Sequence, residues 1–111
     1  MRVFFHPEFP KDIRRFAAEY AQVSDGLAER FRQEVDAAVE VIRSAPGGAG
    51  HFLNVGSAVV TELRRRNLRG FPFFVLYGVL GDRLLFGAVI PSRSDPLTWL
   101  ARFGQTGGSQ R

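Results

Sequence analysis

Hydrophobic residues follow a helical period through the first half of the chain. The first apolar stripe is Phe9, Ile13, Phe16, Ala17 and Tyr20, and the pattern assigns Lys11, Asp12, Arg14, Arg15 and Glu19 to the opposite, polar face. The second stripe is Leu27, Phe31, Val35, Ala38 and Ile42. Residues 24–26 separate the stripes, Ser24 or Asp25 can cap the second helix, and Pro46 followed by glycines ends it. The spacing therefore predicts an antiparallel helical hairpin.

Strand-like patterns surround this hairpin. A short strand is expected over residues 2–6, a glycine-containing loop over 45–57, and three strands over 59–66, 71–80 and 83–90. Gly81 and Asp82 suit a two-residue turn between the last two strands. Both faces of strand 71–80 are apolar, with Phe73, Val75, Tyr77 and Val79 on one face and Phe74, Leu76 and Gly78 on the other. This strand is therefore expected at the centre of the sheet.

The resulting order is β-α-α-β-β-β, an α+β fold in which a helical hairpin packs on a small, mostly antiparallel sheet. A short C-terminal helix is expected over residues 96–102, capped by Asp95 and with Trp99 packed inward. Residues 104–111 lack apolar periodicity and are expected to form a flexible tail. We therefore expect a single domain over residues 1–103.

Composition removes several function classes. The chain has 111 residues and no cysteine, which excludes disulfides, thiolate catalysis and cysteine-ligated metals. The N-terminus lacks the architecture of a signal peptide, and no apolar run approaches the roughly 20 residues of a membrane span. A cytoplasmic protein with no membrane association is the expectation.

Positive charge is concentrated in the second half. Residues 1–58 carry seven Lys/Arg against eight Asp/Glu, whereas residues 59–111 carry eight against three. Four arginines fall within six positions: Arg64, Arg65, Arg66 and Arg69. On a strand Arg64 and Arg66 share a face and Arg65 opposes them. The cluster predicts contact with nucleic acid or an acidic protein segment, and Tyr77, Arg93, Trp99 and Arg102 are further candidate contacts in the basic half.

Catalytic and metal chemistry find little support. His6 and His51 are far apart and accompanied by no acidic ligand pattern, which is unlike a zinc site. No nucleophile elbow or phosphate-binding P-loop is present. We therefore assign no catalytic residue, metal or cofactor.

From Val3 to Arg102 the chain resembles the RelE/ParE toxin superfamily of bacterial type II toxin–antitoxin systems, in particular its ParE-like ("plasmid stabilisation") branch. His6-Pro7-Glu8 is similar to the family's opening "h-P-E-A". The run from Arg69 to Tyr77 is similar to "R-x-F-P-Y-x-V-x-Y". Ala88-Val89 followed by Arg93-Ser94-Asp95-Pro96 and Trp99 is similar to "A-V-x-H-x-R-R-x-P-x-x-W". The resemblance implies the α+β fold described above.

Three departures from the family pattern favour the ParE-like branch. Pro91 stands at the family's histidine, Ser94 at the second of its paired arginines, and Phe73 at a common tyrosine. RNA cleavage needs groups that take and give protons, and arginine is a poor base. Tyr77 is the only other titratable group near the motif.

The resemblance implies a toxin that is neutralised by an acidic, ParD-like antitoxin in a hetero-oligomer. Its implied target is DNA gyrase, which it would inhibit by binding and thereby arrest replication. Two alternatives stay open. The first is a RelE-like, ribosome-dependent endoribonuclease that cuts mRNA; its phosphates would be held by Arg64, Arg66, Arg69 and Arg93, and Tyr77 would assist. The second is a decayed toxin that only binds its antitoxin.

Overall fold

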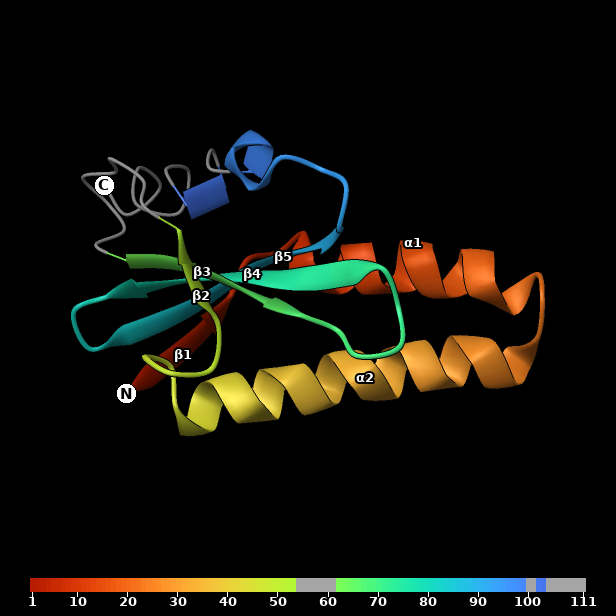
Figure 1. The fold of residues 1–111 in the computed structure, drawn as a ribbon, viewed down its shortest axis with the longest axis horizontal. Coiled ribbons are helices and arrows are strands. Elements are labelled where there is room, and N and C mark those ends of the chain that lie inside the picture. The colour runs from red at the N-terminus through yellow and green to blue at the C-terminus, as the bar shows by residue number, and fades with distance from the viewer. Residues whose placement is uncertain (54–61, 100–101, 104–111) are drawn as a thin grey trace.

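The computed structural model describes residues 1–53, 62–99 and 102–103, and has the expected α+β architecture (Figure 1). In chain order the elements are β1 (Arg2–Phe5), α1 (Phe9–Ala21), α2 (Asp25–Ser44), β2 (His51–Leu53), β3 (Glu62–Asn67), β4 (Phe73–Leu80), β5 (Arg83–Pro91) and the 3-10 helix η1 (Pro96–Trp99). The sheet order is β1-β5-β4-β3-β2. Of the strand pairs in the described residues, β1–β5 alone is parallel. No helix in the described part of the chain is both long and apolar enough to cross a membrane.

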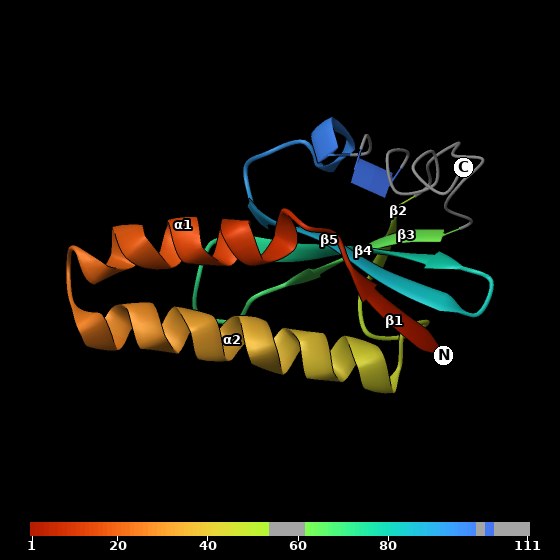
Figure 2. The same ribbon diagram turned by 180° about the vertical axis from the view of Figure 1, so that it is seen from behind.

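Local signals in the sequence set the bounds of the helical hairpin. The Nδ1 atom of His6 accepts a hydrogen bond from the Glu8 N–H at 3.0 Å and shapes the turn into α1. The Ser24 hydroxyl accepts from the Leu27 N–H at 3.0 Å and caps α2. The two helices pack side by side and extend beyond the sheet in both views (Figures 1 and 2). The predicted hairpin is confirmed.

The sheet is covered on both faces, as the pattern of β4 predicted. Phe73, Val75 and Tyr77 join the cluster beneath the helices, whereas Phe74 and Leu76 join a second cluster on the other face. The helices lie on one side of the sheet and η1 on the other (Figures 1 and 2). β4 is the third of five strands, so its predicted central position is confirmed.

Gly81 makes the turn between β4 and β5 with a φ of 56°, a conformation that favours glycine, so the predicted hairpin turn is also confirmed. Farther along, the β4–β5 register shifts between Leu76 and Tyr77. This bulge places Gly87 against the Phe103 ring: a Cβ at Gly87 would lie 2.5 Å from the ring's Cζ. The fully buried Phe103 therefore closes the second face at a position that only glycine allows.

Several predicted bounds were wrong. The expected loop over residues 45–57 contains the short strand β2, which pairs with β3. The strand predicted from residue 71 begins at Phe73. The predicted strand start at residue 59 lies outside the described residues, and β3 is described from Glu62 onward. The predicted helix 96–102 is a 3-10 helix over Pro96–Trp99, and its last predicted residue, Arg102, is helical. Residues 100–101 and the expected tail 104–111 lie outside the described residues. The single domain over residues 1–103 stays a prediction.

Candidate partner-binding groove

Two arginines of the predicted cluster are used by the fold. The Arg64 guanidinium donates to the Gly50 carbonyl at 2.8 Å and also pairs with Glu62. The Arg66 guanidinium donates to the Ala49 carbonyl at 2.5 Å. Both side chains leave the same face of β3, as predicted, and that face meets the segment following α2. They donate to backbone oxygens of that segment and thereby hold it on the sheet.

Arg65 leaves the opposite face of β3, as predicted. Its guanidinium lies 3.8 Å from the centre of the Phe74 ring, which is a close cation–π contact. It also donates to the Asn67 side-chain oxygen at 2.9 Å. Arg65 therefore does not converge with Arg64 and Arg66 on one ligand.

Tyr77 is completely buried, in keeping with its predicted place on an apolar face of β4, and this burial corrects its choice as a candidate partner contact. Its hydroxyl donates to the Pro46 carbonyl at 3.1 Å. Burial raises the pKa of the phenol above its usual value of about 10, and nearby Arg64 opposes part of that rise. The Tyr77 side chain extends from β4 to the turn after α2 and is covered there. In this conformation it therefore cannot contact RNA or a protein partner.

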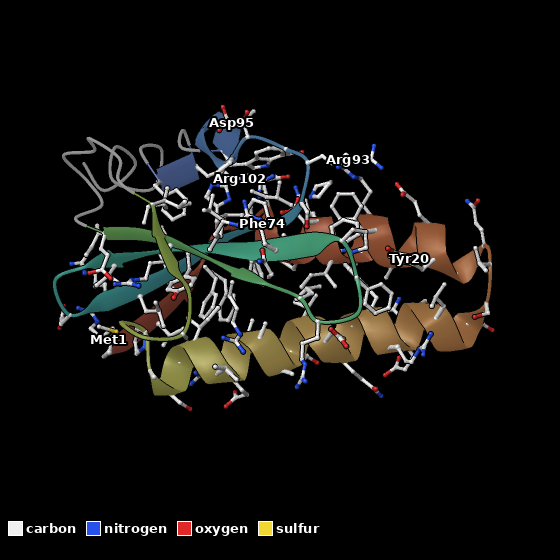
Figure 3. The ribbon with its side chains drawn as sticks, in the orientation of Figure 1. Met1, Tyr20, Phe74, Arg93, Asp95 and Arg102 are labelled. Carbon is white, nitrogen blue, oxygen red and sulfur yellow. The ribbon has the colours of Figure 1, made fainter. Side chains whose placement is uncertain are left out.

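Arg102 also belongs to the fold rather than to a free surface. Its guanidinium meets the Asp12 carboxylate at 2.8 and 3.2 Å and donates to the Gly87 carbonyl at 2.9 Å. Asp12 additionally accepts from the Val89 N–H at 3.0 Å. The pair joins α1, β5 and the C-terminal segment, and Arg102 is drawn above the sheet in Figure 3.

Asp12 was wrongly assigned to the polar face of its helix; it is 7 % exposed. The signal that could have placed it correctly was in the sequence. Asp12 is three residues after Phe9 and four before Phe16, so it lies within the apolar stripe. A carboxylate at such a position requires buried donors, and Arg102 with the Val89 N–H supply them.

The remaining candidates lie apart from one another. Trp99 is partly buried and packs on the second apolar cluster, in keeping with its predicted inward orientation. Arg93 is exposed and lies away from Asp95 in Figure 3. The structure therefore does not bring Arg93 and Trp99 together with the β3 arginines in one site.

Arg69 does contribute to a concave surface. It lies in the connection between β3 and β4, which is fixed to α2 because the Arg69 and Gly70 N–H groups donate to Glu34 Oε1 at 2.9 and 3.0 Å. Sequence analysis missed Glu34, since its role depends on a contact between residues far apart in the chain.

Between α2 and this connection runs a groove of about 400 Å³, which we call the α2 groove. It is lined by Arg30, Gln33, Glu34, Ala37, Ala38, Val41, Arg66, Asn67, Leu68 and Arg69. A recess of about 370 Å³ adjoins it at Arg66 and Asn67. Arg30 and Arg69 are exposed beside an apolar floor, Arg66 borders it while its guanidinium donates to the Ala49 carbonyl, and the single lining carboxylate already accepts two backbone N–H groups. The α2 groove thus suits an acidic segment with apolar side chains.

No protein-family model matches the sequence, and no curated protein matches it. A structural match exists in a solved structure described as the chromosomal ParDE TA system from P. aeruginosa. The TM-score is 0.66 at 14 % sequence identity, and the match covers 82 % of this chain and 95 % of the other. The likeness establishes a shared fold, and with it the expected ParE-like fold class.

Proposed function

We propose that this chain is the toxin of a bacterial type II toxin–antitoxin pair and that an acidic antitoxin neutralises it. The observation that carries the proposal is the fold shared with a chain of a ParDE system over 82 % of the present chain. The arginines beside the apolar floor of the α2 groove support an acidic partner. The antitoxin would place apolar side chains over Ala38 and Val41 and carboxylates beside Arg30 and Arg69.

The free chain would inhibit DNA gyrase in the cytoplasm by binding, without chemical catalysis. The burial of the Tyr77 hydroxyl supports a binding toxin over a ribonuclease, because it takes the one non-arginine candidate for proton transfer out of reach. Arg64 and Arg66 are also committed to backbone carbonyls, which leaves them poorly placed to hold RNA phosphates.

The proposal is tested by assaying DNA supercoiling by purified gyrase with and without the purified chain, with trapped cleavage complexes scored in the same reactions. Inhibition that is reversed by an acidic protein encoded beside this chain is the expected result. Growth arrest on induction without any effect on gyrase would reject this target. Ribosome-dependent mRNA cleavage would then be tested with the wild type and Tyr77→Phe.

A further inference from the structure

Among the strands that the structure describes, β1 ends the strand order, with β5 as its neighbour on one side and an open edge on the other. The Arg2 N–H donates to the Asp82 carbonyl and the His6 N–H to the Phe86 carbonyl, each at 2.9 Å. In a parallel ladder alternate residues direct their backbone groups toward the neighbouring strand. The N–H and C=O groups of Val3 and Phe5 therefore point outward, where an added strand would bind.

Exposed apolar side chains are concentrated on this edge. Five large hydrophobic residues are exposed in the described part of the chain, and three are at the N-terminus: Met1 at 64 %, Phe4 at 39 % and Phe5 at 46 %. Phe4 and Phe5 leave opposite faces of β1. Phe5 stacks on Phe86 with a centroid distance of 4.9 Å, so its orientation is fixed while half of the side chain stays uncovered.

Positive charge flanks the exposed Phe4 ring. Arg2 and Arg83 face each other in register on β1 and β5, and their guanidinium carbons lie 5.4 and 5.9 Å from the ring centre. Like charges directly opposite on neighbouring strands are destabilising. In the described residues, no carboxylate forms an ion pair with either arginine. A second copy of this chain paired at β1 would bring further arginines beside Arg2 and Arg83. An acidic segment would instead relieve the repulsion between these two side chains.

We propose that the β1 edge binds an extended, acidic segment of a partner protein, which adds to the sheet as a sixth strand. Single-stranded nucleic acid fits less well, because it would use the Phe4 face alone. A peptide strand would use the outward backbone groups and the exposed side chains of both faces. This surface is separate from the α2 groove, and the proposal stands whether or not the chain is a toxin.

The test is an NMR titration of the full chain with a synthetic peptide of alternating Val and Glu, about eight residues long. The amides of Val3 and Phe5 are expected to shift most and to become protected from hydrogen exchange. A peptide N-methylated at alternate residues, and one with Lys in place of Glu, are expected not to bind. Arg2→Ala with Arg83→Ala should weaken binding about fivefold, whereas the control pair Arg14→Ala with Arg32→Ala should leave the affinity unchanged.

Several results would overturn the proposal. One is the absence of peptide binding at millimolar concentration; another is equal binding of the N-methylated peptide. Unchanged peptide affinity in the Arg2/Arg83 variant would also reject it. So would a titration in which oligo(dT) binds and shifts the Phe4 amide signal while the peptide fails to bind. Because Phe4→Ser removes an exposed side chain, it provides a second variant that should fold and bind more weakly.

Discussion

The arginines of this chain fall into two groups that look alike in the sequence. Arg64, Arg66 and Arg102 turn inward and donate to backbone carbonyls. Arg30 and Arg69 line the α2 groove, and Arg69 is exposed. The guanidinium groups of the first group bind neighbouring segments of the fold, although Arg66 also borders the α2 groove, whereas those of the second group remain able to meet a partner. A cluster of arginines in a sequence therefore does not show how many of them are free to bind a partner, because some of them serve the fold.

The largest expected effect comes from breaking the innermost pair. Asp12→Ala leaves the Arg102 guanidinium and the Val89 N–H without their carboxylate, and should lower the free energy of unfolding by about 3 kcal/mol. Asp36→Ala, at an exposed position of α2, is the control and should change it by less than about 0.5 kcal/mol. Urea denaturation measures both. Equal, small losses would show that the Asp12–Arg102 pair does not hold the C-terminal segment.

The contact between Gly87 and Phe103 offers the next largest effect. Gly87→Ala forces its new methyl group into the Phe103 ring and should cost about 2 kcal/mol. In a Phe103→Leu background the same change should cost less, because the ring atoms that it meets are gone. A double-mutant cycle in urea measures this coupling. Additive losses would mean that Phe103 does not rest on Gly87.

Tyr77→Phe should cost about 1.5 kcal/mol near neutral pH, because the Pro46 carbonyl loses its donor. Burial raises the pKa of Tyr77 in the folded chain, so above about pH 10 the unfolded chain ionises this phenol first and stability falls. The variant should therefore lose less stability between neutral pH and about pH 11 than the wild type. Burial also raises the pKa of Tyr20, so both proteins should still lose some stability at alkaline pH through this second tyrosine. Identical pH profiles for the two proteins would contradict a buried Tyr77.

The smallest difference separates one inward from one outward arginine. Arg66→Met should lower the free energy of unfolding by about 1 kcal/mol, because Ala49 loses its donor. Arg69→Met should change it by less than about 0.5 kcal/mol, since within the described residues Arg69 is tied to the fold by its backbone N–H. Thermal and urea unfolding of the matched pair test the distinction directly. A larger loss from Arg69→Met would reverse our assignment of the two arginines.

Short-range signals predicted the fold well. The apolar stripes and the Ser24 cap predicted the helical hairpin, and Gly81 with the two-sided strand predicted the β4–β5 hairpin. β2 was missed because three residues within a glycine-rich segment carry no reliable period. Its pairing with β3 comes from long-range contact.

The site was predicted less well because side-chain partners depend on the tertiary structure. Whether an arginine on β3 faces solvent or a carbonyl depends on where the turn after α2 lies. Glu34 shows the same limit, since it meets the Arg69 and Gly70 N–H groups from 35 and 36 positions away. Asp12 is different, because its place within the apolar stripe was visible in the sequence.

The most direct test of the account is calorimetric titration of the chain with its acidic antitoxin, using two double variants of equal charge change. Arg30→Glu with Arg69→Glu places carboxylates in the α2 groove, whereas Arg14→Glu with Arg32→Glu places them on exposed helix positions outside it. We predict a loss of affinity greater than about tenfold for the groove variant and much less for the control. Equal affinities in the two variants, or no binding by the wild-type chain, would contradict an acidic antitoxin seated in the α2 groove.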